Sequence, residues 1–381
     1  MNKIKICHIT RDINPFYHYF FGGVPNWIKY ICEITSSYYK NIYICPETND
    51  KTPNKFANVY FIKKYNNFFL NRIYSFIHIF RILKKERPKL IHLYLLSTLN
   101  EIEIYLLKKL LKIKIVATCF NDISTSTLLN FQYRILKTTF LDKIIVINRN
   151  LKRILIKYNI PKDKLVIIPV IPNKNFYEVE NNSNIINNKS QKKIQILFSA
   201  GLRKEMGLYY IIKEFITLSK ISKNLKFIIS YVNNDTNEKI IQKIKSILNK
   251  YNVSDSFIFK GFIYDMKSFL KQIDILVIPI LKYKSKMNTP KMALEALLMG
   301  KLIISTPYGG MPELISNYEN GILIEPIENN FVNEIIKIIN ENKELINKCG
   351  INGRKKILDK FHPKLINLKI LEFYNKLLNT K

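Results

Sequence analysis

Residues 288–326 read NTPKMALEALLMGKLIISTPYGGMPELISNYENGILIEP and hold the clearest structural pattern in the chain. They follow the apolar run DILVIPI, which is typical of a buried strand. A helix comes next, for which Asn288 or Thr289 is a suitable N-cap and Pro290 a suitable first residue. The runs KLIISTP and GILIEP then predict two more strands, separated by the turn YGGMPEL. This alternation of strands and helices indicates an α/β protein with a parallel sheet.

The same stretch offers groups that suit a phosphorylated ligand. Parallel sheets bind ligands beyond the carboxyl ends of their strands, and a helix that starts there presents free N–H groups to an anion. Lys291 adds a cation in the first turn, and Glu295 can accept two hydrogen bonds from a ribose diol. Gly309 and Gly310 permit close backbone approach, and Glu313 lies in the first turn of a further helix. Taken singly, each of these residues also fits an ordinary exposed helix or turn.

The strand–helix rhythm continues on both sides of this stretch. Residues 177–193 interrupt it with a polar, Asn-rich segment that is typical of an exposed connector. We therefore predict a Rossmann-like domain at residues 1–176, a linker at 177–193 and a second Rossmann-like domain at 194–360. An amphipathic helix within residues 361–381 ends the chain and can pack back on the first domain.

Composition limits the class of protein. The chain has 381 residues, 47% of them hydrophobic, which is enough for two buried cores. Its 5 cysteines are scattered without metal-ligand spacing, which suits a reducing compartment. No signal peptide and no run of about 18 apolar residues is present, so we expect a cytoplasmic protein without a membrane span.

The formal net charge of +32 has two interpretations. One is attraction to an anionic membrane face. The other is the Lys-, Ile- and Asn-rich composition that an A+T-rich genome produces. Because no nucleic-acid recognition motif accompanies the charge, we expect no nucleic-acid partner.

The ordered motifs resemble glycosyltransferase family 4. In the second half, Glu295-Ala296, Gly300-Lys301, GGMPE from Gly309 and NGIL from Asn320 match the family's order and spacing. Elsewhere the matching segments are GGVPNWIKYI, RPKLIHLY, VATCFND, KDKLVIIPVIPNKNF and LFSAGLRKEMGLYYIIKEF. The resemblance covers nearly the whole chain.

Several expectations follow from the resemblance alone. The fold is expected to be GT-B, two doubly wound domains facing a cleft, with the donor site in the second. The expected activity is that of a retaining hexosyltransferase that uses a nucleotide diphosphate sugar of UDP or GDP, without a metal or other cofactor. The expected acceptor is a glycan or lipid-diphosphate-linked glycan of a surface polysaccharide such as lipopolysaccharide or capsule. The enzyme is then expected in the cytoplasm or peripherally on the inner membrane face.

The chain departs from the family pattern at several site positions. Met206 stands where the family has its phosphate-binding Lys, and Met287 stands where the first Glu of the family's Glu pair falls. Arg203 and Lys204 lie in the same loop as Met206 and are our substitutes for the phosphate role.

The first half supplies the remaining candidates. Asn121 replaces the family's His at the end of a strand, and Asp122 is retained. We assign catalytic roles to Asp122 and to His18, which precedes a glycine pair. Gly22 and Gly23 are expected to approach the donor phosphate or the acceptor, with an ordinary strand-to-helix turn as the alternative.

Residues 67–85 form a predicted helix that mixes aromatic and aliphatic residues with Arg and Lys. Such a basic amphipathic helix can lie on an anionic membrane, but a helix of this kind more often packs its apolar side on its own sheet.

Two alternatives to a transferase remain. The losses at Met206 and Met287 suit a catalytically inactive, sugar-nucleotide-binding partner of an assembly complex. A sugar-nucleotide epimerase of the same shape is the other alternative, because fold alone does not determine chemistry.

Overall fold

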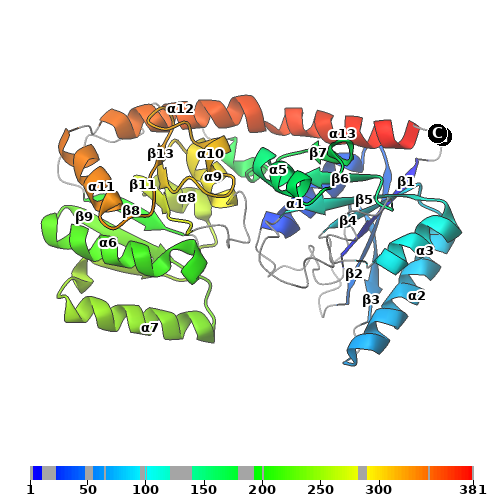
Figure 1. Ribbon diagram of the computed structural model, residues 1–381, viewed down its shortest axis with the longest axis horizontal. Helices are drawn as coiled ribbons and strands as arrows, with labels where there is room; N and C mark the ends of the chain where they lie inside the picture. Colours follow the sequence, from blue (N-terminus) through cyan, green and yellow to red (C-terminus); the bar gives the residue numbers. More distant parts are fainter. Residues whose placement is uncertain are drawn as a thin grey trace. The chain divides into compact units, whose positions relative to one another are not determined.

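The computed structural model describes residues 3–10, 23–47, 55–63, 66–94, 99, 101–120, 140–178, 193–199, 201–281, 290–341 and 344–379. The chain divides into two compact units (Figure 1). The first comprises residues 1–170 and 363–381, and the second comprises residues 171–362. Most of the predicted linker, residues 179–192, lies outside the described residues.

The first unit is built on a parallel sheet of seven strands in the order β3-β2-β1-β4-β5-β6-β7. The strands are β1 (Lys5–Ile9), β2 (Lys40–Pro46), β3 (Asn58–Ile62), β4 (Leu90–Tyr94), β5 (Lys114–Cys119), β6 (Lys143–Val146) and β7 (Leu165–Ile167). All residues of β4 and all but the first of β1 and β5 are buried. Burial on both faces explains why these segments read as continuous apolar runs rather than alternating ones.

The helices of the first unit are α1 (Gly23–Thr35), α2 (Phe68–Glu86), α3 (Glu101–Leu111), α5 (Arg149–Lys157) and α13 (Pro363–Asn379). The Asn148 side chain caps α5 by accepting a hydrogen bond from the Leu151 N–H at 2.7 Å. Helix α13 joins this unit from the far end of the chain, and Tyr30 of α1 hydrogen-bonds Asn367 of α13.

A buried polar network fastens α13 to the sheet. The His92 ring on β4 hydrogen-bonds the Tyr374 hydroxyl of α13 at 2.5 Å and the Thr118 hydroxyl of β5 at 2.6 Å. On β1, His8 bonds the Tyr94 hydroxyl at 2.8 Å. These groups are withdrawn from water, and each ring nitrogen of the two histidines has a partner.

The second unit repeats the architecture with a parallel sheet of six strands in the order β10-β9-β8-β11-β12-β13. The strands are β8 (Ile194–Phe198), β9 (Leu225–Ser230), β10 (Phe257–Lys260), β11 (Ile275–Ile278), β12 (Leu302–Ser305) and β13 (Ile322–Leu323). The helices are α6 (Leu208–Ile221), α7 (Asp235–Lys250), α8 (Met266–Lys271), α9 (Lys291–Leu298), α10 (Met311–Leu314), α11 (Asn330–Glu341) and α12 (Glu344–Phe361). The prediction of two parallel-sheet α/β domains is therefore confirmed.

Both sheets reverse their strand order once. In the second unit the reversal lies between β8 and β11, which pair directly with Ile275 opposite Ile196. Loops that leave two such strands at their carboxyl ends diverge to opposite sides, which opens a place for a ligand. The β8–α6 loop and the start of α9 both lie at this reversal.

Candidate nucleotide-binding site

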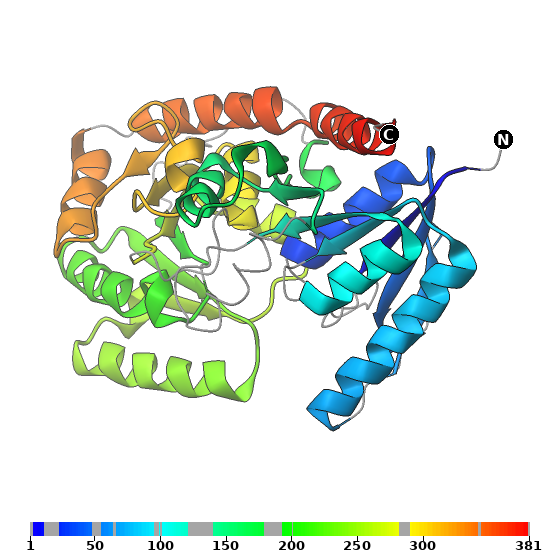
Figure 2. The ribbon, with the colours of Figure 1, turned by 45° about the vertical axis from the view of Figure 1, so that its right-hand side comes forward.

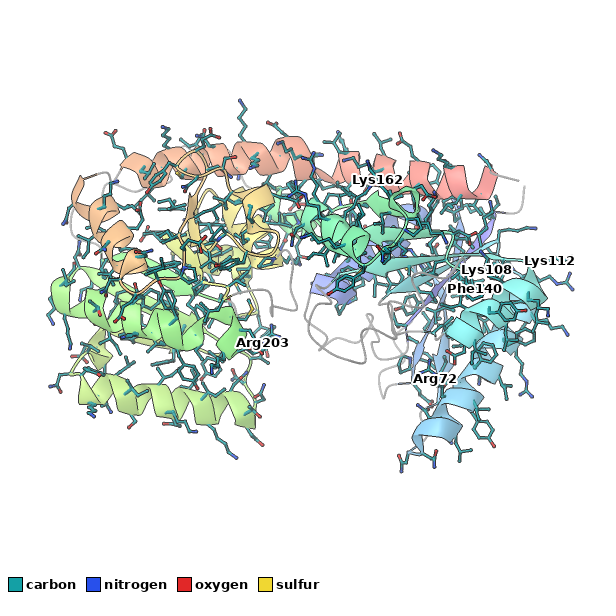
Figure 3. The ribbon with its side chains drawn as sticks, in the orientation of Figure 1. Arg72, Lys108, Lys112, Phe140, Lys162 and Arg203 are labelled. Carbon is teal, nitrogen blue, oxygen red and sulfur yellow. The ribbon has the colours of Figure 1, made fainter. Side chains whose placement is uncertain are left out.

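The loop after β8 brings two predicted phosphate ligands to the surface. Arg203 and Lys204 are exposed, and Figure 3 shows Arg203 beside the start of α6. Met206, which follows in the 3-10 turn Lys204–Met206, is 1% exposed and packs into the core. A core side chain thus fills the position at which the resemblance places a phosphate-binding Lys, and two exposed cations, Arg203 and Lys204, lie just before it.

Gly207 fixes this loop against the end of β11. It has φ +76°, and a Cβ at this position would lie 2.0 Å from the carbonyl oxygen of Pro279. The Leu281 N–H also donates to the Glu205 carbonyl at 2.9 Å. Only glycine satisfies both the left-handed conformation and the close approach, so the loops after β8 and β11 are held together at the reversal point.

Helix α9 begins at the same edge of the sheet. Pro290 is its N-cap with ψ 124°, so the helix starts at Lys291, one residue later than the sequence suggested. The predicted caps Asn288 and Thr289 lie outside the described residues. Extended backbone at Pro290 is the reason for the correction, because a first helical residue needs helical ψ.

Lys291 and Glu295 form an ion pair one turn apart on α9. The Lys291 Nζ lies 3.2 Å from Glu295 Oε1, and the two side chains are only 15% and 6% exposed. Burial lowers the pKa of Lys291, and the Glu295 carboxylate opposes that shift. A cation with so little water around it gains strongly from an additional anion.

Asn173 completes this cluster and was not among the predicted site residues. Its side-chain carbonyl accepts a hydrogen bond from Lys291 Nζ at 2.5 Å, and its backbone N–H lies 3.5 Å from Glu295 Oε1. It lies just after the start of the second unit, far from α9 in sequence. The only sequence signal was its place in the family-like passage IPNKNF, which carries no chemistry by itself.

The turn after β12 is the third part of the site. The Thr306 hydroxyl donates to the Ile280 carbonyl at 2.6 Å, which ties β12 to the end of β11. Gly309 has φ +62°, a left-handed conformation that favours glycine, whereas Gly310 has φ −89°. The freedom expected of Gly310 is therefore not used. Glu313 lies half-buried in the first turn of the four-residue helix α10.

The candidates of the first half are mostly outside the described residues, namely His18, Gly22 and Asp122 together with the departure Asn121. In the second half, Met287 also lies outside them. Gly23 is described and is the first residue of α1. His8 and His92 are buried in β1 and β4.

The described parts of the chain contain no group of three or more His, Cys, Asp or Glu side chains arranged to hold a metal ion. Among the helices described, none has the length and hydropathy needed to cross a bilayer.

Two doubly wound parallel-sheet domains in one chain define the class of architecture known as the GT-B fold. The chain belongs to the glycosyltransferases: the model described as "Glycosyltransferase Family 4" matches residues 21–170, and that described as "Glycosyl transferases group 1" matches residues 179–356.

A known protein of similar sequence is also a glycosyltransferase. A glycosyltransferase of uncharacterized function from Methanocaldococcus jannaschii is 27% identical over 197 residues, which are 51% of this chain and 48% of that protein. The chain thus spans about half the length of this relative.

Two solved structures share the fold over 98% of this chain and all of theirs. Anabaena HepE in complex with UDP has a TM-score of 0.78 at 14% identity. The lipopolysaccharide outer core galactosyltransferase WaaB has a TM-score of 0.69 at 14% identity.

Proposed function

We propose that this protein transfers a hexosyl group from a UDP- or GDP-sugar to a glycan or lipid-diphosphate-linked acceptor. The observation that carries the donor part is the buried Lys291–Glu295 pair at the head of α9, at the strand reversal of the second sheet. Open α/β sheets bind nucleotides at such a reversal, and a helix N-terminus favours phosphate.

The candidate site residues at the β8–α6 loop and on α9 each have a role in this proposal. The first-turn N–H groups of α9 and the Lys291 ammonium hold the diphosphate, whose negative charge grows as the sugar leaves. Arg203 and Lys204 supply the positive charge that Met206 does not. The Glu295 carboxylate accepts hydrogen bonds from the ribose hydroxyls, and these bonds replace part of its contact with Lys291.

The turn after β12 and the first unit supply the remaining residues of the proposal. Gly309, Gly310 and the N–H groups near Glu313 face the sugar or a phosphate oxygen. Gly22 and Gly23 approach the phosphate or the acceptor, and Asp122 and His18 act on the acceptor hydroxyl or the transferred sugar. We propose retention at the anomeric carbon and no metal cofactor for the reaction.

The proposed pathway is surface-polysaccharide synthesis at the inner face of the cytoplasmic membrane. Its support is the shared fold with WaaB, a lipopolysaccharide galactosyltransferase, together with the net charge of +32. A basic surface favours an acceptor that carries a lipid diphosphate in an anionic membrane.

A thermal-shift panel of UDP, GDP, ADP, CMP and their common sugar conjugates tests the donor proposal. A ligand that binds only the folded protein stabilises it by RT ln(1 + [L]/Kd), so one diphosphate series should raise the Tm. A Tm that does not change with any of them would contradict the proposal.

One observation favours a second candidate, a sugar-nucleotide-binding partner without activity. The Met206 side chain is uncharged and buried in the core, so this position cannot contribute a cation. The two candidates separate by donor turnover: release of the nucleoside diphosphate from the bound donor supports the transferase, and binding without release supports the inactive partner.

A further inference from the structure

Among the described side chains of helix α2, apolar residues form two faces, one buried and one exposed. Ile79, Ile82 and Leu83 are buried, which agrees with packing on the sheet of the first unit. The opposite stripe exposes apolar side chains to between 40% and 56%, namely Leu70, Ile73, Tyr74 and Ile77. Their spacing follows the helical period, so they form one continuous strip on the outer side of the helix.

Helix α3 presents a similar strip beside it. Ile102 is 68% exposed, and Tyr105, one turn further on, is 40% exposed on the same outer side. Figures 1 and 2 show α2 and α3 next to each other, and the two helices are in contact. Each precedes one of the neighbouring parallel strands β4 and β5, so the helices run in the same direction and their apolar ends adjoin.

The same strips continue as basic surface. Beyond Ile77, the outer face of α2 carries the exposed residues His78, Arg81, Lys84 and Lys85. Beyond Tyr105, that of α3 carries the exposed Lys109, and Lys112 follows the last turn, at the end of α3 in Figure 3.

The described acids of these helices are turned inward. Glu86 of α2 accepts hydrogen bonds from Lys5 at 2.9 Å and from Tyr60 at 2.5 Å. Glu103 of α3 pairs with Arg72 of α2 at 3.1 Å and is 7% exposed. Among the described side chains, the outer faces of α2 and α3 therefore hold apolar and basic groups without an exposed carboxylate.

We propose that the outer face of α2 and α3 docks on an anionic lipid bilayer. Apolar side chains at one end enter the acyl boundary, while Arg and Lys at the other end bind lipid phosphates, the pattern of an interfacial amphipathic surface. A second copy of this chain is a poorer occupant, because it would bring the same basic residues together.

The proposed docking surface has a consequence for the acceptor. The apolar ends of α2 and α3 are their N-terminal ends, which follow the carboxyl ends of β3 and β4, the edge at which parallel sheets bind ligands. This edge would then lie nearest the bilayer, where a lipid-linked acceptor is held. The inference rests on the proposed acceptor class but not on the donor site.

The test is sedimentation of the full chain with vesicles of phosphatidylglycerol and phosphatidylcholine, compared with phosphatidylcholine alone. The wild type should bind the anionic vesicles and lose binding as salt rises. Ile73→Ser with Ile77→Ser should lower the partition coefficient about tenfold, because exposed apolar area no longer enters the interface. Lys84→Glu with Lys85→Glu should lower it about tenfold at low salt.

Matched controls separate this face from general effects. Leu365→Ser with Leu368→Ser changes two exposed apolar residues of α13, and Lys239→Glu with Lys243→Glu makes the same charge change on α7. Both controls should bind vesicles much better than the α2 variants.

Specific outcomes would overturn the docking proposal. These are no vesicle binding by the wild type, equal binding by the Ile73/Ile77 variant, or an equal loss in the α13 control. A wild-type dimer that the Ile73/Ile77 substitutions dissociate would assign the face to a second copy instead. The Tm shift with the nucleotide, measured on the same variants, should be retained, so a failure here is distinguishable from failure of the donor proposal.

Discussion

At the scale of single residues, Lys291 is the group whose chemistry the fold alters most directly. Its ammonium contacts Glu295 and Asn173, and its side chain is 15% exposed. Burial lowers its pKa below the ordinary 10.5, so on the alkaline side the free protein loses this proton earlier than an exposed Lys would. A bound diphosphate favours the charged form and raises the pKa again.

We therefore predict that the protein takes up protons when a diphosphate binds at a pH between the lowered pKa of Lys291 and 10.5. Titration calorimetry in two buffers of different ionisation enthalpy should give different heats in this pH range. The difference should vanish in Lys291→Met, which keeps the aliphatic stem. Heats that agree in both buffers for the wild type would show that Lys291 does not face the phosphate.

A second residue-scale prediction concerns the glycines of the β8–α6 loop. Gly207→Ala should lower the free energy of unfolding by at least about 2 kcal/mol, since it adds a clash with the Pro279 carbonyl to a left-handed φ. Gly201→Ala is the matched control, with φ +87° but no atom nearer than 3.9 Å, and should cost only about 1 kcal/mol. Equal losses in urea unfolding would mean that the contact with Pro279 does not hold the loop.

Sequence reasoning found Lys291 and Glu295 because motif spacing places them on one helix. It did not find Asn173, since that contact depends on how the segment after β7 folds back. It also did not show that Met206 is buried. A methionine two residues before an apolar helix fits a core and a surface equally well, and only packing decides.

At the scale of elements, α13 depends on a polar network that needs uncharged histidines. Burial lowers the pKa of His8 from 6.5 to about 4 and that of His92 well below 6.5. A basic group whose pKa is lower in the folded state than in the unfolded state causes no loss of stability at a pH above its unfolded-state pKa. As the pH falls from about 6.5 to about 4, the unfolded state binds protons first and the folded state loses stability.

We predict that the first unit loses about 3 kcal/mol of stability through His8 as the pH falls from 7.5 to 4. The chain has 1 Trp, Trp27, which is buried in α1 of this unit, so its fluorescence reports this unit alone during urea unfolding. His8→Gln should flatten the pH dependence in this range. A midpoint that is constant between pH 7.5 and 4.5 in the wild type would contradict the buried, neutral state of these histidines.

Helix α2 shows where element prediction reached its limit. The sequence predicted its existence and nearly its bounds, with residues 67–85 expected and Phe68–Glu86 found. It offered packing on the sheet and membrane contact as alternatives. The structure gives the helix one apolar face for the sheet and a second exposed one, because aromatic and aliphatic residues occupy more of its circumference than a single contact can cover.

At the scale of the whole molecule, the strand–helix rhythm predicted both sheets. Apolar runs such as LIHLY and DILVIPI became central strands because parallel strands buried on both faces need no polar alternation. The boundary between the units was harder to predict. The chain passes from one unit to the other at residues 170–171 and 362–363, whereas the sequence placed the changes at 176–177 and 360–361. Composition indicates which segments are exposed, whereas a unit is defined by the contacts among its residues.

The central claim is that the second unit binds a nucleoside diphosphate through Glu295 and the cations around α9. Calorimetric titration of UDP and GDP, and of uridine and guanosine, into the wild type, Glu295→Ala and Arg203→Ala with Lys204→Ala tests it most directly. We predict that one diphosphate binds, that Glu295→Ala weakens nucleoside and diphosphate alike by about tenfold, and that the double variant weakens only the diphosphate. Absence of diphosphate binding by the wild type, or unchanged affinity in Glu295→Ala, would contradict the account.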